Sequence, residues 1–211
     1  MKILMVCASP SPQNSTSLYL LNALSQRLGP EHETAVYSIA GLEADVAASQ
    51  IAEALPGCDA LVLAYSLYVD GLPALLIDVL KQLEPLCAAH CGQVPVHQIV
   101  NNGFYEATEN ALAIEMVWNW CSACGFGQGA ALGVGGGPMA KAAPLGHGPC
   151  ATLGKRLHSL AEAVALNKTR EIFYSQPDFP RFLYLWAGNQ SWNRLAKKNG
   201  LRPAQLKGKA L

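Results

Sequence analysis

The chain alternates five times between a run of strand length and a stretch with helical periodicity. The predicted strands are residues 3–8, 34–39, 59–64, 94–101 and 130–134. Several of these runs are continuously apolar, which is typical of parallel strands that are buried on both faces. Repeated strand–helix units predict a doubly wound sheet with helices on both sides. We therefore expect an α/β fold, with a five-stranded parallel sheet in a three-layer α/β/α arrangement.

Each predicted strand leads into a predicted helix. The clearest helix spans residues 16–28, where leucines recur at helical spacing until Gly29-Pro30 ends the pattern. The other helices are expected at about 44–55, 73–91, 110–124 and 149–166. Pro73 suits a first helical turn, and Gly125 suits the residue after a helix end.

The charge is unevenly distributed, although the formal net charge is zero. Residues 168–211 contain nine Lys or Arg and two acidic residues, so they carry +7 and residues 1–167 carry −7. We therefore expect a compact domain over 1–167. Residues 168–211 form a basic, aromatic C-terminal extension with a helix near 181–199.

The extension has three competing explanations. Its larger apolar side chains fall on one face of the predicted helix: Phe182, Leu185, Trp186, Trp192 and Leu195. Such a face packs on its own domain or a dimer partner, lies on a membrane, or binds nucleic acid. The first explanation is favoured, so we expect a homodimer with neither membrane association nor nucleic-acid binding. Seven cysteines without a disulfide pattern, and no apolar run of roughly 18 residues, favour the cytoplasm.

Ligands of such sheets bind beyond the carboxyl ends of the strands, so the loops after those ends are the candidate sites. The first of these loops places an amide and five hydroxyls around a predicted helix start: Ser9, Ser11, Asn14, Ser15, Thr16 and Ser17. The free N–H groups and partial positive charge of a helix N-terminus favour an anion. An ordinary N-cap needs only one hydroxyl, so this loop predicts a phosphate site. Neither a P-loop nor a dinucleotide motif is present.

Residues 8–16 read Ala-Ser-Pro-Ser-Pro-Gln-Asn-Ser-Thr, and residues 66–74 read Ser-Leu-Tyr-Val-Asp-Gly-Leu-Pro-Ala. In order and spacing these segments resemble the phosphate loop and second flavin loop of the NAD(P)H-dependent FMN reductase family, within the flavodoxin-like superfamily. Residues 102–106 and 135–137 occupy the places of that family's third and fourth loops. The resemblance covers about residues 1–165.

The resemblance implies FMN as cofactor, NAD(P)H as reductant and a role for each loop. The first-loop residues would surround the phosphate. The flavin ring would be lined by Ser66, Leu67, Tyr68 and Val69, and its pyrimidine edge by Asn102, Gly103, Phe104 and Tyr105, with Gly136 beside them. Two structural alternatives remain open beside these roles: Tyr68 packs between helix and sheet, or residues 135–137 form only a turn; contact with the ligand is the favoured interpretation of both. No catalytic side chain is expected, because the cofactor carries the hydride chemistry.

Three positions depart from the family pattern. Ala8 replaces a usual glycine, Ser66 replaces a usual proline, and Ser11 stands where arginine is frequent. The missing arginine removes a direct charge partner for the phosphate. The helix N-terminus and the hydroxyls are then expected to hold it.

Two cysteine motifs suggest a metal, but the sequence context disfavours one. Cys87-x-x-His90-Cys91 and Cys121-x-x-Cys124 both lie on predicted helices, where free cysteines are commonly small buried side chains. We therefore expect no metal site. His147 follows the triglycine and is expected on the surface rather than as a proton donor.

Three functions fit these observations. In the favoured one, an FMN enzyme takes hydride from NAD(P)H and reduces a small-molecule acceptor such as a quinone, flavin, nitro or azo compound or metal complex. In the second, the chain is a flavodoxin-like electron carrier without NAD(P)H activity. In the third it is a non-catalytic interaction module, which the missing arginine keeps open.

Overall fold

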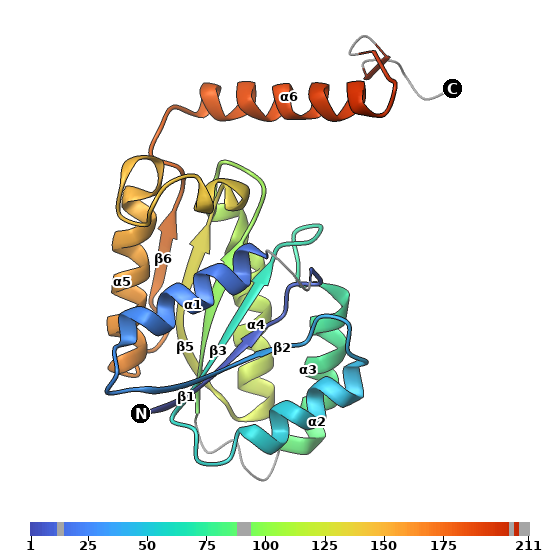
Figure 1. Cartoon of the computed structure of the whole chain (residues 1–211). Helices are drawn as coiled ribbons and strands as arrows, with labels where there is room; N and C mark the ends of the chain where they lie inside the picture. Colours follow the sequence, from blue (N-terminus) through green and yellow to red (C-terminus); the bar gives the residue numbers. More distant parts are fainter. Residues whose placement is uncertain (12–14, 88–93, 203–204, 207–211) are drawn as a thin grey trace. The chain divides into compact units, whose positions relative to one another are not determined.

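The computed structural model describes residues 1–11, 15–87, 94–202 and 205–206. The chain divides into two compact units, Met1–Pro177 and Asp178–Leu211. The first unit is a parallel sheet between two layers of helices, as Figure 1 shows. This confirms the α/β doubly wound class predicted from the alternation of strands and helices.

The sheet has six parallel strands in the order β2-β1-β3-β4-β5-β6. Their bounds are Lys2–Cys7 (β1), Glu33–Ser38 (β2), Ala60–Ser66 (β3), Pro95–Asn101 (β4), Gly127–Val134 (β5) and Ile172–Ser175 (β6). The first five follow the order 2-1-3-4-5, in which β2 lies on one side of β1 and the later strands are added on the other side, from β3 on. The central strands β1, β3 and β4 are almost completely buried, as their apolar sequences predict.

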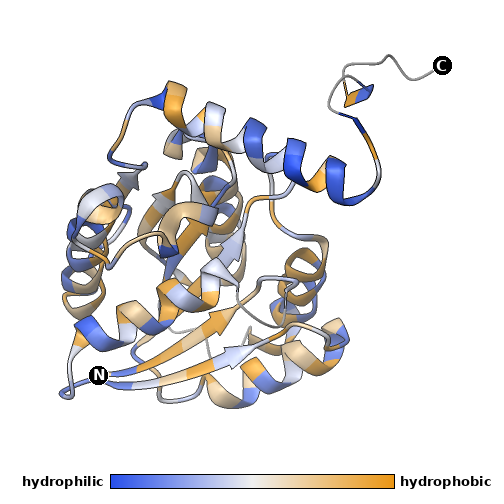
Figure 2. Ribbon diagram, turned by 45° about the horizontal axis from the view of Figure 1, so that its top comes forward, coloured by the Kyte–Doolittle hydropathy of each residue, from blue (hydrophilic) through white to orange (hydrophobic). Residues whose placement is uncertain are grey.

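Five helices cover the two faces of the sheet. Helices α1 (Thr16–Leu28) and α5 (Ala151–Ala165) pack on one face. Helices α2 (Ala44–Ala54), α3 (Ala74–Cys87) and α4 (Ala111–Cys124) pack on the other. Short 3₁₀ turns precede α4 and α5, at Ala107–Asn110, Gly137–Lys141 and Gly148–Cys150. Figure 2 shows the apolar residues concentrated in the strands and on the sheet-facing sides of these helices.

The sixth strand corrects the predicted number of five. Strand β6 pairs with β5 from Ala131↔Ile172 to Val134↔Ser175. It lies in the segment that we assigned to the extension, and the first unit ends at Pro177 rather than at residue 167. The physical reason is that an edge strand needs only one short apolar run. The run at 172–174 was hidden among the charged residues around it.

A buried histidine holds an irregularity between β4 and β5. The register shifts between Val96 and Gln98, and the N–H of Ala130 donates to Nδ1 of His97 at 2.9 Å instead of to a strand carbonyl. The neighbouring Gly129 leaves room for the imidazole, since a Cβ there would lie 2.8 Å from Nδ1. Nε2 of His97 is buried and has no partner among the described residues. Burial lowers the pKa of His97 to about 4, so the ring is neutral at pH 7.

Candidate functional site

The loops after β1, β3, β4 and β5 are joined by hydrogen bonds at the carboxyl edge of the sheet. The N–H of Leu67, after β3, donates to Asn101 O at 2.8 Å, and the N–H of Asn102, after β4, donates to Val134 O at 2.9 Å. Thr16, after β1, donates its hydroxyl to Gly137 O at 3.2 Å. These bonds bring together the four loops that the sequence selected as candidate ligand contacts.

Helix α1 begins at this edge with a well-formed N-cap. Ser15 has extended backbone angles, and its Oγ accepts a hydrogen bond from the N–H of Leu18 at 3.0 Å. The first N–H groups of an α-helix, here those of Thr16 and Ser17, make no hydrogen bond within the helix. They point out of the helix end together with the positive end of its dipole. The helix end therefore offers backbone donors to an anion.

Beneath the edge lies a polar network that sequence reasoning missed. The amide of Asn101 donates to Ser17 Oγ at 2.8 Å and to Tyr65 O at 2.9 Å, and Ser17 Oγ lies 3.5 Å from Ser66 Oγ. Asn101 and Ser17 are both buried. The network joins α1 to the ends of β3 and β4. The only sequence signal was an amide at the last position of a buried strand.

The network changes what the predicted phosphate residues can contribute. Ser17 Oγ accepts from the Asn101 amide, the Thr16 hydroxyl donates to Gly137 O, and Ser15 Oγ accepts from the N–H of Leu18. Ser9 is buried, and its Oγ accepts from the N–H of Ser11 at 3.4 Å. Asn14 lies outside the described residues. These bonds lie within the chain, and the hydroxyls of Ser9 and Ser15, which accept in them, can still donate to a phosphate together with the backbone N–H groups.

The triglycine after β5 fits closely against the loop after β4. A Cβ on Gly135 would overlap the carbonyl oxygen of Tyr105, and one on Gly137 would lie 2.8 Å from Asn101 Oδ1. Gly136 adopts φ +62°, in the left-handed region that favours glycine. At positions 135 and 137 glycine is required by neighbouring loops of the same chain. This explanation needs no ligand.

We predict that Gly135→Ala lowers the free energy of unfolding by about 1–3 kcal/mol, because the methyl group meets backbone that cannot move alone. Gly103→Ala in the neighbouring loop is the matched control, since a Cβ there has nothing within 4 Å. Urea unfolding of the two variants checks this. Equal stability of both would contradict the packing described here.

Tyr68 lies at the start of a tight two-residue turn after β3. Its N–H and C=O both bond to Gly71, at 3.0 and 2.9 Å, and the turn residues Val69 and Asp70 have φ of +46° and +60°. A β-branched residue with positive φ is strained, and Val69 is fully exposed. Tyr68 itself is 49% exposed, so it does not pack between helix and sheet. The turn presents an aromatic ring and an apolar side chain to solvent.

In the loop after β4, some side chains form hydrogen bonds within the chain and others are exposed. Asn102 is buried, and its amide donates to Glu106 O at 3.1 Å while its Oδ1 accepts from the N–H of Phe104 at 3.0 Å. Tyr105 donates its hydroxyl to Pro177 O at 3.3 Å. Phe104 is 55% exposed. Asn102 therefore forms the loop, and Phe104 is a side chain that the loop presents to solvent.

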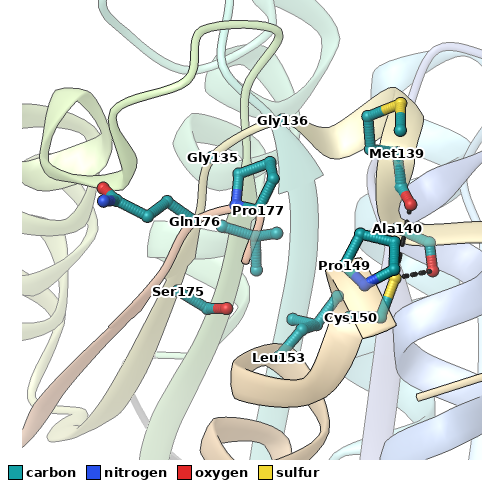
Figure 3. Close-up of a pocket in the computed structure, with 11 residues that line it drawn as sticks. Gly135, Gly136, Met139, Ala140, Pro149, Cys150, Leu153, Ser175, Gln176 and Pro177 are labelled. Atoms are coloured by element: carbon teal, nitrogen blue, oxygen red, sulfur yellow. Dashed lines mark hydrogen bonds between the residues drawn. The ribbon is translucent and has the colours of Figure 1, made fainter. Parts of the chain in front are cut away.

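A small cavity lies beneath the triglycine turn, between the ends of β5 and β6 and the start of α5 (Figure 3). Its volume is about 10 Å³, which holds one water molecule rather than a cofactor. Cys150 lines it, with Sγ 3.4 Å from Met139 O and 3.7 Å from Ala140 O. Ser175 also lines it, and its buried Oγ has no partner among the described residues.

The other chemically active side chains are structural or exposed. Tyr65 is fully buried and donates its hydroxyl to Gln98 Oε1 at 2.7 Å, and burial raises its pKa well above 10. Cys121 is buried in the core under α4, where burial raises its pKa to about 12. His147 is exposed. Within the described ranges no three His, Cys, Asp or Glu side chains gather as metal ligands, and His90 and Cys91 fall outside those ranges.

The sequence matches no protein-family model and no curated protein sequence. Solved structures do match. An NADH:FMN oxidoreductase in its apo form superposes with a TM-score of 0.62 at 15% identity, covering 81% of this chain and 91% of that one. A Streptococcus pneumoniae flavodoxin matches with a TM-score of 0.53 at 17% identity, covering 79% and 99%.

An azoreductase from Bacillus anthracis matches with a TM-score of 0.51 at 14% identity, covering 79% of this chain and 98% of its own. The three proteins span nearly their full length in these matches. Their sheets and helices superpose on the strand order and the two helical layers described above. The first unit of this chain therefore has the flavodoxin-like fold.

Proposed function

We propose that the chain is an FMN-dependent oxidoreductase that takes hydride from NAD(P)H and reduces a small organic or metal acceptor. The observation that carries this proposal is the convergence of four loops at the carboxyl edge, with a helix N-terminus and two exposed aromatic side chains among them. Neighbours of the same fold include an NADH:FMN oxidoreductase and an azoreductase.

The residues at the edge fit a mononucleotide rather than a dinucleotide. The start of α1 supplies backbone donors for one phosphate group. The sequence there has neither arginine nor lysine to pair with a second phosphate. Tyr68 and Phe104 supply apolar, aromatic surface of the kind that a flat ring system contacts. FMN combines one phosphate with one such ring.

Each part of the chain then has a limited task. The start of α1 would hold the phosphate through backbone N–H groups, and the Asn101 network ties Ser17, in the first turn of α1, to the ends of β3 and β4. The strained turn at Val69 and Asp70 holds Tyr68 outward. FMN, when bound, supplies the hydride chemistry. No side chain needs to act as an acid or base.

We predict that the protein loaded with FMN loses its yellow absorbance when NADH or NADPH is added without oxygen, and regains it when a quinone or azo dye follows. The order of additions separates donor from acceptor. The measurement is an absorbance spectrum after each addition, with the FMN-loaded protein alone as control.

Two other outcomes identify the alternatives. If dithionite bleaches the bound FMN but neither NADH nor NADPH does, the protein is an electron carrier without NAD(P)H activity. If the protein takes up no FMN at all, the remaining function is that of an interaction module. Either result contradicts the proposed enzyme.

A further inference from the structure

Helix α6 (Arg181–Lys198) is a complete helix with its own end signals. It begins after Pro180 and ends in a glycine cap, where Gly200 has φ +76°. The N–H of Leu201 donates to Ala196 O at 2.9 Å and that of Gly200 to Lys197 O at 3.0 Å. These two bonds form a Schellman motif, which satisfies the last carbonyls of a helix. The helix is thus specified by local sequence.

One face of α6 is apolar, aromatic and exposed. Its exposed fractions are 67% for Phe182, 46% for Leu185, 62% for Trp186, 68% for Trp192 and 48% for Leu195. These five residues recur at helical spacing and so share one face. Ala196 is the only residue of the helix that is buried. Figure 2 shows apolar and polar residues alternating along α6, as expected for a helix with two unlike faces.

The opposite face is basic. Arg194 and Lys198 lie there, one turn apart, and Lys197 lies at the border between the faces, whereas Arg181 lies on the apolar side, at the first residue of the helix. The helix contains no acidic residue, and residues 178–211 contain seven Lys or Arg against the single Asp178. The positive charge of this segment favours binding to an anionic surface.

We infer that α6 binds the surface of an anionic lipid bilayer, lying in the plane of the interface. Helices that lie at a membrane interface typically carry tryptophan, phenylalanine and leucine on one face and basic residues on the other. Indole rings favour the headgroup level, and basic side chains gain from anionic headgroups. Within the described residues, no helix is long and apolar enough to cross a membrane. The helix lies on the bilayer and leaves the first unit outside it.

This inference differs from the expectation that the extension packs on protein. Strand β6 already accounts for the part of the extension that joins the sheet. The exposed large apolar side chains of the first unit come from many separate elements, among them Val36 of β2, Val46 of α2, Leu86 of α3 and Leu112 of α4.

The test is flotation of the full-length protein with vesicles. We expect the protein to float with vesicles of phosphatidylcholine mixed with phosphatidylglycerol, and to stay behind with phosphatidylcholine alone. Salt should weaken the binding, because it screens the headgroup charge. Brominated acyl chains should quench the fluorescence of the bound protein, and a Trp186→Phe, Trp192→Phe variant should still bind but lose this quenching.

Matched variants separate the two faces. Arg194→Gln with Lys198→Gln should weaken binding by on the order of tenfold or more, because two charges that favour the anionic surface are lost. Trp192→Ser should weaken it by roughly tenfold through lost apolar burial. Leu183→Ser is the control, since Leu183 is 42% exposed but lies on the basic side of the helix. Circular dichroism shows whether each variant is folded.

Three outcomes would overturn lipid binding by α6. One is failure of the folded protein to float with anionic vesicles, and another is equal binding to neutral vesicles. The third is that Trp192→Ser disrupts a dimer, or binding to nucleic acid, while vesicle binding stays unchanged. Lipid binding does not depend on FMN, so it stands or falls independently of the proposed oxidoreductase.

Discussion

Ser15→Asp should abolish FMN binding while leaving the fold intact. Aspartate is as good an N-cap as serine, so the hydrogen bond from the N–H of Leu18 is retained, and a negative charge at this end suits the helix dipole. The same charge repels a phosphate held by the first turn of α1. Two unit charges in close contact near a protein surface interact by about 4 kcal/mol. We therefore expect FMN affinity to fall by at least roughly a hundredfold.

Ser15→Asn is the matched control, because asparagine caps equally well without a charge. Its FMN affinity should stay within about fivefold of the parent, a difference of about 1 kcal/mol. The affinities are measured by quenching of flavin fluorescence, and urea unfolding without flavin shows that both variants are folded. An aspartate variant that binds FMN like the parent would place the phosphate elsewhere.

The second large effect is a loss of stability in mild acid that is caused by His97. The folded pKa is about 4 and the ordinary value is 6.5, so the unfolded chain takes up the proton first. The stabilisation from the neutral ring is complete above pH 6.5 and is lost as the pH falls toward 4. A shift of this size corresponds to about 3 kcal/mol.

The variant His97→Gln isolates this contribution. Acidic residues also titrate in this range, so the quantity to compare is the difference in unfolding free energy between parent and variant. That difference should change by about 3 kcal/mol between pH 7 and pH 4, measured by urea unfolding at several pH values. A constant difference across this range would show that His97 is not buried as a neutral ring.

The sequence predicted most of the fold because the central strands and their helices carry strong local signals. Helix α1 was predicted with the bounds that the structure shows, since a leucine stripe and a terminal glycine define it. Strand β6 was missed because its apolar run is very short. A four-residue edge strand has too little local signal to stand out in a basic segment.

The site was predicted at the level of loops rather than of atoms. Topology alone places the ends of β1, β3, β4 and β5 at one edge, so the candidate segments came from the strand pattern. Which hydroxyls face a ligand depends on hydrogen bonds between distant loops, such as Asn101 to Ser17. The glycines at 135 and 137 likewise serve contacts that no local pattern reveals.

The central claim is that the turn before α1 binds the phosphate of FMN. A crystal structure of the protein grown with excess FMN tests it most directly. We expect the phosphate within hydrogen-bonding distance of the N–H groups of Thr16 and Ser17, with the ring beside Tyr68. A structure in which FMN occupies another part of the surface, and this turn binds nothing, would contradict it.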